Sequence, residues 1–173
     1  MIVVTIGTNE QPFDRLVRAV SELETSEPLF VQYGSSTITS GPGDWRDYLG
    51  FDELASRMRD ARVVICHAGV GSIMLARQCK RRPIVMPRRV DRLEAVDDHQ
   101  LLLAQRLHAS GLVTLVEDEG DLAEAIATVN GDATAFGEGA LPGAAALAAS
   151  VGSFLDRLGA PPNHAADPGA GGG

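Results

Sequence analysis

Residues 64–73 read VICHAGVGSI. The first three are apolar, as in a strand buried on both faces, and HAGVGS at 67–72 adds two glycines, a histidine and a serine. The residues from Ile73 onward then take helical spacing. A buried strand, a glycine-containing exit and a helix start in direct succession are typical of a parallel α/β sheet, in which a helix follows each strand.

The same alternation continues on both sides of this stretch. Apolar runs predict strands at 1–6, 29–33, 62–66, 84–86 and 112–116, with a further short strand at 48–51. Helical spacing predicts helices at 13–23, 52–60, 97–110 and 121–129, and from the 67–72 exit to about residue 78. We therefore expect an α/β fold, a Rossmann-like three-layer domain with a six-stranded, mostly parallel sheet.

The chain has 173 residues, the size of one ordinary domain. We expect that domain at 1–130, a linker and a C-terminal helix at 131–158, and a disordered tail rich in glycine, proline and alanine at 159–173. The apolar stripe of the final helix fits packing on the domain and contact with a partner equally well.

Charge is distributed unevenly along the chain. The net charge is −8, from 15 Lys and Arg against 23 Asp and Glu. A pI near 4.9 argues against general nucleic-acid binding, which needs positive charge facing the phosphates. Basic residues nevertheless gather between 77 and 92. This cluster is either a solvated face or a contact for acidic lipid or a partner.

The sequence indicates a cytoplasmic protein. No apolar run approaches the roughly 20 residues of a membrane-spanning helix. The apolar N-terminus lacks the basic lead-in of a signal peptide. Cys66 and Cys79 have no CxxC spacing and suit a reducing compartment. The four histidines lack the spacing of known metal motifs, so we expect no metal.

Parallel sheets bind ligands beyond the carboxyl ends of their strands, where exit loops and helix starts converge. Glycine there lets a ligand approach the backbone, and the unpaired N–H groups of a helix start attract anions. Four expected exits carry small or polar residues: 7–9, 34–36, 67–72 and 87–100. The sequence therefore predicts an anion or nucleotide site at this edge.

The common nucleotide motifs are incomplete or missing. Gly69-Val70-Gly71 begins the dinucleotide fingerprint GxGxxG, but Met74 stands where the third glycine belongs, and the segment does not follow the first strand. Neither GxxxxGK[ST] nor GxSxG occurs. These tests disfavour NAD, FAD and P-loop chemistry and leave the kind of anion open.

Six segments form an ordered series: VVTIGT (3–8), FDRLV (13–17), VQYG (31–34), VICHAGVGSI (64–73), PIVMP (83–87) and DHQ (98–100). This series resembles the glycosyltransferase family 28 C-terminal domain over about residues 1–130. The HAGxGS segment with the downstream HQ carries the resemblance most specifically. The resemblance implies one half of a GT-B fold, the half that binds a nucleotide-sugar donor, with the acceptor half in a separate protein.

Within this family, the series is similar to the catalytic subunits of two-component transferases that build dolichol-linked chitobiose or bacterial exopolysaccharide. Such a subunit would be an inverting, metal-independent hexosyltransferase. It would move a hexose-type sugar from a UDP-sugar substrate, without a cofactor, to a lipid-linked or polysaccharide acceptor. It would be cytoplasmic and peripheral at the inner face of the membrane through a membrane-associated partner subunit, and would bind no nucleic acid.

The resemblance also assigns residues. His67–Ser72 would hold the diphosphate, and His99 and Gln100 would contact the donor sugar or phosphate. The catalytic residues stay unassigned, with His67 and Arg88 as candidates, and one of Arg88, Arg89 or Arg92 would stabilise the leaving diphosphate. The full set of expected donor-binding residues is Gly7, Thr8, Asn9, Gln32, Gly34, Ser35, His67, Ala68, Gly69, Val70, Gly71, Ser72, His99 and Gln100.

One position departs from the family pattern. Members commonly carry a glutamate for the ribose hydroxyls three residues after the motif's serine, and here that residue is Leu75. Leucine cannot accept a hydrogen bond. Either another group, such as Gln78 or Glu94, takes over, or nucleotide preference and affinity are altered.

Other interpretations of these residues stay open. The chain would alternatively be a nucleotide-sugar-binding or regulatory module without its own catalysis. A UDP-sugar 2-epimerase shares the architecture but needs both halves in one chain. His67 would alternatively be a core histidine, and the residues at 99–100 simply a polar helix start.

Overall fold

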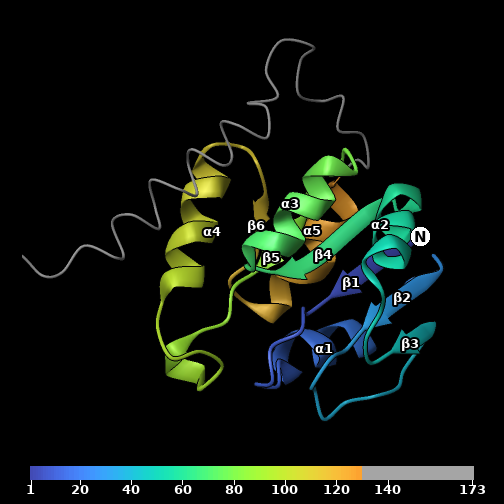
Figure 1. The fold of residues 1–173 in the computed structure, drawn as a ribbon, viewed down its shortest axis with the longest axis horizontal. Coiled ribbons are helices and arrows are strands. Elements are labelled where there is room, and N and C mark those ends of the chain that lie inside the picture. Colours follow the sequence, from blue (N-terminus) through green and yellow to red (C-terminus); the bar gives the residue numbers. More distant parts are fainter. Residues whose placement is uncertain (130–173) are drawn as a thin grey trace, which may run out of the picture. The chain divides into compact units, whose positions relative to one another are not determined.

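The computed structural model describes residues 1–129 (Figure 1). Strands and helices alternate along them, and the short 3-10 helices η1 and η2 follow β5 and β6. In chain order the elements are β1 (Ile2–Thr5), α1 (Asp14–Ser21), β2 (Leu29–Gln32), β3 (Asp44–Arg46), α2 (Phe51–Asp60), β4 (Val63–His67), α3 (Val70–Gln78), β5 (Ile84–Met86), η1 (Val90–Arg92), α4 (His99–Ala109), β6 (Thr114–Leu115), η2 (Glu119–Asp121) and α5 (Leu122–Thr128).

The six strands of the described region form one sheet in the order β3-β2-β1-β4-β5-β6, and every pairing in it is parallel. β1 lies in the middle, where Val4 pairs with Val31 of β2 on one side and with Ile65 of β4 on the other. This arrangement confirms the expected Rossmann-like α/β class.

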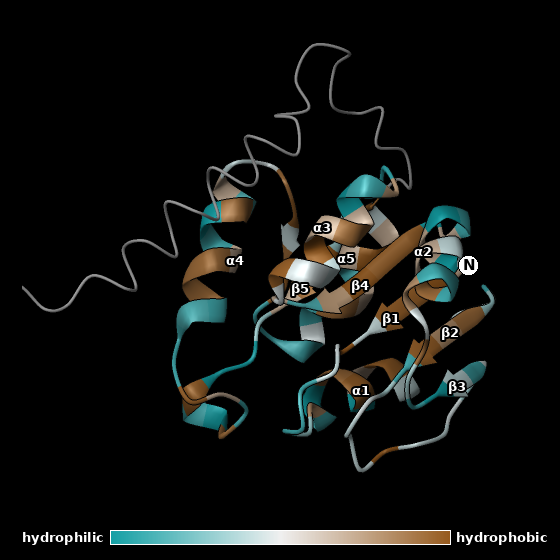
Figure 2. Ribbon diagram, viewed as in Figure 1, coloured by the Kyte–Doolittle hydropathy of each residue, from teal (hydrophilic) through white to brown (hydrophobic). Residues whose placement is uncertain are grey.

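Helices cover both faces of the sheet. Ile2 and Val4 of β1 point into a cluster with α1 and α5, whereas Val3 points into a second cluster with α2 and α3. This alternation follows from the period of two in a strand. Figure 2 shows β1, β2 and β4 as largely apolar ribbons, as expected for strands covered on both sides. The three expected layers are therefore present.

The short strand predicted at 48–51 is wrong. The third strand is β3, Asp44–Arg46, at the edge of the sheet beside β2. Its sequence is polar because only one of its edges is paired and its faces are half-covered. Phe51 instead begins α2, and the side chain of Tyr48 is exposed. The other predicted elements occur with boundaries shifted by a few residues.

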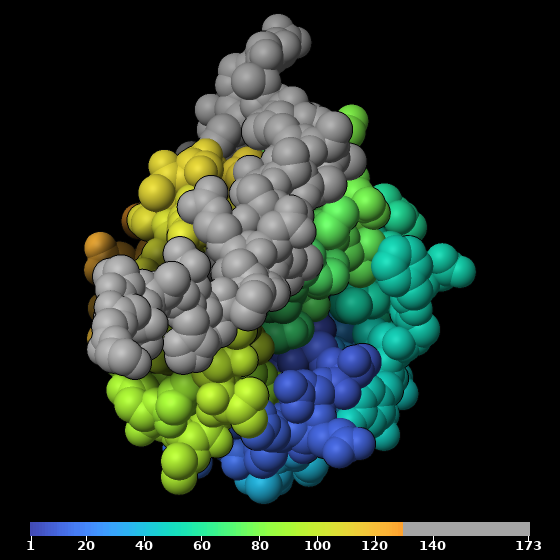
Figure 3. All heavy atoms as spheres, turned by 60° about the vertical axis from the view of Figure 1, so that its left-hand side comes forward, coloured from blue at the N-terminus to red at the C-terminus, as the bar shows by residue number. Residues whose placement is uncertain are grey.

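No helix within residues 1–129 has the length and apolar composition needed to span a membrane. The expected linker and helix at 131–158 and the tail at 159–173 lie outside the described residues. Figure 3 shows the segment after β1, in blue, beside the connection from β5 to α4, in yellow-green. These two segments flank the carboxyl ends of the central strands.

Candidate functional site

A cavity of about 630 Å³ lies at the carboxyl edge of the sheet. Three strands deliver their last residues to it, since Thr5 ends β1, Gln32 ends β2 and His67 ends β4. The starts of α2 and α3 complete its walls. The lining residues are Thr5, Gly7, Thr8, Asn9, Gln32, Leu49, Phe51, Leu54, His67, Gly69, Gly71, Ser72 and Leu75.

Most of the sequence-predicted donor residues meet at this cavity. Eight of them line it: Gly7, Thr8, Asn9, Gln32, His67, Gly69, Gly71 and Ser72. Gly34 and Ser35 lie directly behind the lining, because a Cβ at Gly34 would stand 3.0 Å from the carbonyl oxygen of Gly7 and the Ser35 hydroxyl donates to the carbonyl oxygen of Asn9 at 2.9 Å. Ala68 is buried, and Val70 begins α3.

His99 and Gln100 lie at the start of α4 and do not line the cavity. The ring of His99 is exposed beside the Asp97 carboxylate, with Nδ1 at 3.0 Å from Oδ2. Gln100 accepts a hydrogen bond from the backbone N–H of Arg88 at 3.3 Å. In this structure Gln100 therefore supports the β5–α4 connection, and its contact with a donor stays a prediction.

The imidazole of His67 fills the space between two glycine exits. A Cβ at Gly69 would stand 2.0 Å from its Nε2, and a Cβ at Gly7 would stand 2.4 Å from its Cε1. Gly7 also has a φ of +75°, which side chains rarely adopt. Both exits therefore need glycine to close around the ring and bring their backbones to the cavity.

The electrostatic state of His67 follows from this enclosure. Burial, reinforced by the positive charge of Arg88, lowers the pKa of His67 to about 4, and the Thr5 backbone acts weakly in the opposite direction. The ring is therefore neutral at physiological pH. Its Nδ1 is buried without a hydrogen-bond partner among the described residues. An unsatisfied buried nitrogen of this kind calls for a partner such as a ligand or an ordered water.

The first turn of α3 faces the cavity with Gly71 and Ser72. The N–H of Ile73 donates to the carbonyl oxygen of Gly69 at 3.1 Å and closes the turn. The N–H groups before it have no acceptor within the helix. No acidic side chain lies in this turn to offset the partial positive charge of the helix start. The geometry suits an anion held by backbone N–H groups.

Gln32 holds the cavity floor together. Its Nε2 donates to the carbonyl oxygens of Gly7 and Asp47, each at 2.9 Å, and its Oε1 accepts from the Thr5 hydroxyl. The side chain is only 3% exposed. Its hydrogen bonds therefore tie the β1 exit to the turn after β3 instead of pointing to open space.

The arginine cluster divides into two kinds of side chain. Arg89 pairs with Asp91 at 2.9 Å, and Arg92 lies 3.5 Å from Asp118 and 3.4 Å from Glu119. Arg88 is fully buried, and its Nη1 donates to the carbonyl oxygens of Gln11 and Pro12.

Its guanidinium carbon lies 4.7 Å from the centre of the Phe13 ring. The Nε and Nη2 of Arg88 are buried without partners among the described residues. The charge of Arg88 acts on His67 and is opposed by the nearby Glu94 carboxylate without a direct ion pair to it. Arg89 and Arg92, in contrast, pair directly with carboxylates.

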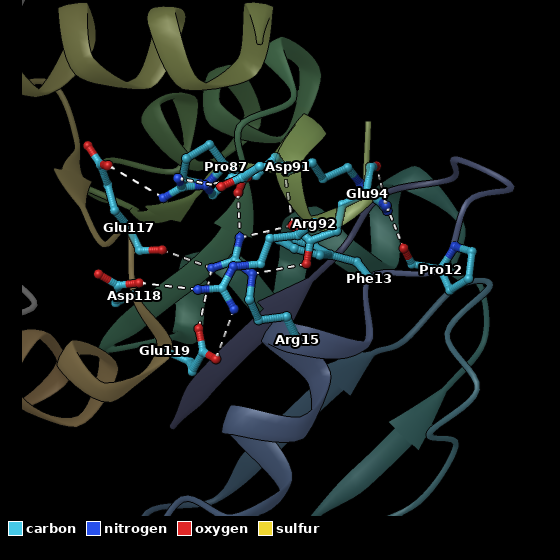
Figure 4. Close-up of polar contacts among 12 residues, drawn as sticks. Pro12, Phe13, Arg15, Pro87, Asp91, Arg92, Glu94, Glu117, Asp118 and Glu119 are labelled. Atoms are coloured by element: carbon cyan, nitrogen blue, oxygen red, sulfur yellow. Dashed lines mark hydrogen bonds and ion pairs between the residues drawn. The ribbon is translucent and has the colours of Figure 1, made fainter. Parts of the chain in front are cut away.

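Figure 4 shows how the β5–α4 connection is anchored. Arg15 of α1 binds both carboxylate oxygens of Glu94 and donates to the carbonyl oxygens of Pro87 and Glu117 at 2.8 and 2.9 Å. Glu94 in turn accepts from the backbone N–H of Arg89 at 3.1 Å. With both oxygens engaged and no place in the cavity lining, Glu94 is unsuited to replace a ribose-binding glutamate; Gln78 does not line the cavity either.

Sequence reasoning missed part of the lining. Leu49, Phe51 and Leu54 line the cavity together with Leu75, and we call these four residues the apolar wall. Leu49 and Phe51 were missed because the strand predicted at 48–51 assigned them to the sheet instead of to the exit after β3. Moving that strand to the polar edge segment 44–46 would have placed the turn at 47–50 on the cavity side.

The parallel sheet with an edge cavity beneath a glycine exit and a helix start defines a Rossmann-like nucleotide-binding fold. The chain matches the family model of the glycosyltransferase family 28 C-terminal domain over residues 1–140, and it belongs to this family. The domain is a half of the GT-B fold and a nucleotide-sugar-binding part of a glycosyltransferase. A comparison with curated proteins finds no match.

Proposed function

We propose that the chain is the donor-binding catalytic subunit of an inverting, metal-independent glycosyltransferase that uses a UDP-sugar. The observation that carries this proposal is the edge cavity, where the acid-free start of α3 lies against two glycine exits. A diphosphate bound there would accept hydrogen bonds from the backbone N–H groups of residues 70–72. The family membership supports a nucleotide-sugar as the source of that diphosphate.

The proposed reaction needs stabilisation of the leaving group. The acceptor hydroxyl loses its proton to a base and attacks the anomeric carbon, the bond from that carbon to the diphosphate breaks, and the diphosphate carries away the electron pair. Backbone N–H groups of α3 and the Arg88 charge would stabilise the developing negative charge. His67, neutral and with an unpaired Nδ1, would hydrogen-bond to the diphosphate rather than balance its charge.

We further propose that the acceptor and the base come from a separate, membrane-associated subunit. The acceptor would be lipid-linked or a growing exopolysaccharide, and the sugar a hexose type. The chain would then act in the cytoplasm, at the inner face of the membrane, through that partner. The two-component transferases that the sequence resembles support this arrangement.

A second candidate is a nucleotide-sugar-binding or regulatory module without catalysis. Leu75 favours it, because a leucine lines the cavity where the family pattern has a carboxylate. Turnover in a reconstituted assay with the acceptor subunit separates the two. Donor binding without transfer would support the module and overturn the catalytic proposal.

Donor binding is tested with Gly71→Val and Gly120→Val. A Cβ at either position meets no atom within 4 Å, so both variants should fold. Only Gly71 lines the cavity, and its new side chain would occupy the expected diphosphate position.

In the wild type, UDP or a UDP-sugar at 100 times its Kd should stabilise the fold by about 2.7 kcal/mol in thermal unfolding. The Gly71 variant should lose this gain and the Gly120 variant keep it. Equal stabilisation of both variants, or no stabilisation of the wild type by any nucleotide, would overturn the site.

A further inference from the structure

The cavity has two chemically different sides. On one side lie the glycine exits and the start of α3, with Thr8, Asn9 and Ser72 as polar neighbours. On the other side lies the apolar wall of Leu49, Phe51, Leu54 and Leu75. An anion held at the start of α3 would therefore have this wall beside it.

The apolar wall is an extension of the core between α2 and α3. Leu75 is 6% exposed and packs in the cluster that contains Ala55 and Met58, and Leu49 and Leu54 pack against the same cluster. Phe51 is 67% exposed at the first position of α2 and offers its ring to the cavity. The wall is thus a packed leucine surface with one exposed aromatic ring.

Of the described residues that line the cavity, none carries a charged side chain. Gln32 is buried with both amide hydrogens and its oxygen already engaged, and Asn9, the other amide of the lining, accepts the N–H of Gln11 with its Oδ1 at 2.8 Å. Nucleotide sites of this fold class commonly use an acidic side chain to bind the ribose hydroxyls. The apolar wall offers no such acceptor.

We propose that the nucleoside of the donor packs against the apolar wall and that the site makes no hydrogen bond to the ribose 2′-hydroxyl. This inference rests on the proposed function, because it takes the diphosphate at α3 as given. It follows that ribonucleoside and 2′-deoxyribonucleoside diphosphates bind equally well. The substrate class of the site is thereby widened to donors activated by either kind of nucleotide.

The test uses the full chain and isothermal titration with UDP, dUDP and inorganic pyrophosphate. The Kd values of UDP and dUDP should agree within about threefold, since a lost hydrogen bond to a charged group would separate them by about tenfold or more. Phe51→Ala should weaken both nucleotides by about tenfold through lost stacking, and leave pyrophosphate unchanged. Leu102→Ala, which truncates an exposed apolar side chain of α4 outside the lining, is the control and should change none of the three.

The outcomes distinguish a failure of this inference from a failure of the proposed donor-binding function. UDP binding at least tenfold tighter than dUDP overturns the inference and leaves the donor site in place. Equal binding with no effect of Phe51→Ala also overturns it, because the nucleoside would then lie elsewhere. No binding of UDP, dUDP or pyrophosphate overturns the proposed function, and the inference with it.

Discussion

The Arg15 guanidinium and the Glu94 carboxylate form a two-point ion pair in the interior, with Nε to Oε1 at 2.9 Å and Nη2 to Oε2 at 3.0 Å. The two residues are 79 positions apart, and both side chains are almost fully buried. The pair joins α1 to the β5–α4 connection (Figure 4). It therefore holds in place the segment that carries Arg88, whose charge acts on His67.

We predict that Glu94→Ala lowers the free energy of unfolding by about 3 kcal/mol, because the buried Arg15 loses its two-point carboxylate partner and keeps only the more distant Glu119, at 3.7 Å. Urea unfolding at pH 7 measures the loss. Glu53→Ala, which breaks an exposed helical pair with Arg57, is the control and should cost less than about 0.5 kcal/mol. Similar losses in the two variants would contradict a special role for the buried pair.

The stability of the domain should depend on His67 in acid. The pKa of His67 is about 4 in the folded chain and about 6.5 in an unfolded one. The unfolded chain therefore binds this proton more readily, and the folded state loses stability as the pH falls from 6.5 toward 4. Above pH 6.5 the residue makes no difference to the pH dependence.

His67→Gln removes this titration. Between pH 7.5 and 4.5 the free energy of unfolding of the wild type should fall by on the order of 2 kcal/mol more than that of the variant. Urea unfolding across this range measures both curves. Parallel curves would show that the His67 proton is bound equally in the folded and unfolded states.

Replacing Arg88 should slow turnover, whereas replacing Arg89 or Arg92 should not. In an assay reconstituted with the acceptor subunit, Arg88→Met should lower kcat/KM by about a hundredfold, as expected for a lost charge on the leaving group. Arg89→Ala and Arg92→Ala remove guanidinium groups already paired with carboxylates and should stay within about twofold. Circular dichroism and UDP titration would show whether the Arg88 variant remains folded and binds donor. A folded, donor-binding variant with normal kcat/KM would rule out the proposed charge.

The two cysteines should be inert in the native protein. Cys66 lies in β4 with no exposed surface, and burial raises the pKa of its thiol to about 12. Cys79 is the C-cap of α3 and is 8% exposed, and burial also raises the pKa of its thiol. A thiol reacts as the thiolate, so alkylation of Cys66 must wait for the strand to open.

With iodoacetamide at pH 8, we expect Cys79 to react before Cys66, and both to react at once in urea. UDP at 100 times its Kd should slow labelling of Cys66 by about a hundredfold, because binding lowers the population of the open state. Mass spectrometry of quenched samples measures both rates. Native labelling of Cys66 at the rate of a free thiol would contradict its burial.

The sequence predicted the sheet well because its central strands are unambiguous. β1 and β4 are nearly continuous apolar runs, which indicate strands covered on both faces, and a glycine exit follows each of them. The edge strand β3 was misplaced for the opposite reason. Asp44 and Arg46 suit a half-covered edge, whereas the apolar residues at 48–51 serve the exit and the start of α2.

Local sequence patterns predicted the part of the candidate site that lies at the strand exits. Gly7, Gly69 and Gly71 could be predicted because glycine directly after a strand lets a ligand approach the backbone, and this pattern is visible within a few residues. The buried pair of Arg15 and Glu94 was beyond reach, since no short-range pattern connects residues so far apart. The predicted donor-binding roles of the site residues remain predictions.

The ring of His67 between the two glycine exits also constrains how this sequence can evolve. A methyl group at position 69 would overlap the ring as it stands, so a larger residue there requires that the histidine rotate away or be replaced by a smaller residue. Position 7 gains nothing from that change, because its positive φ still calls for glycine. Substitution at 69 therefore depends on the side chain at 67, while position 7 stays closed to substitution in either case.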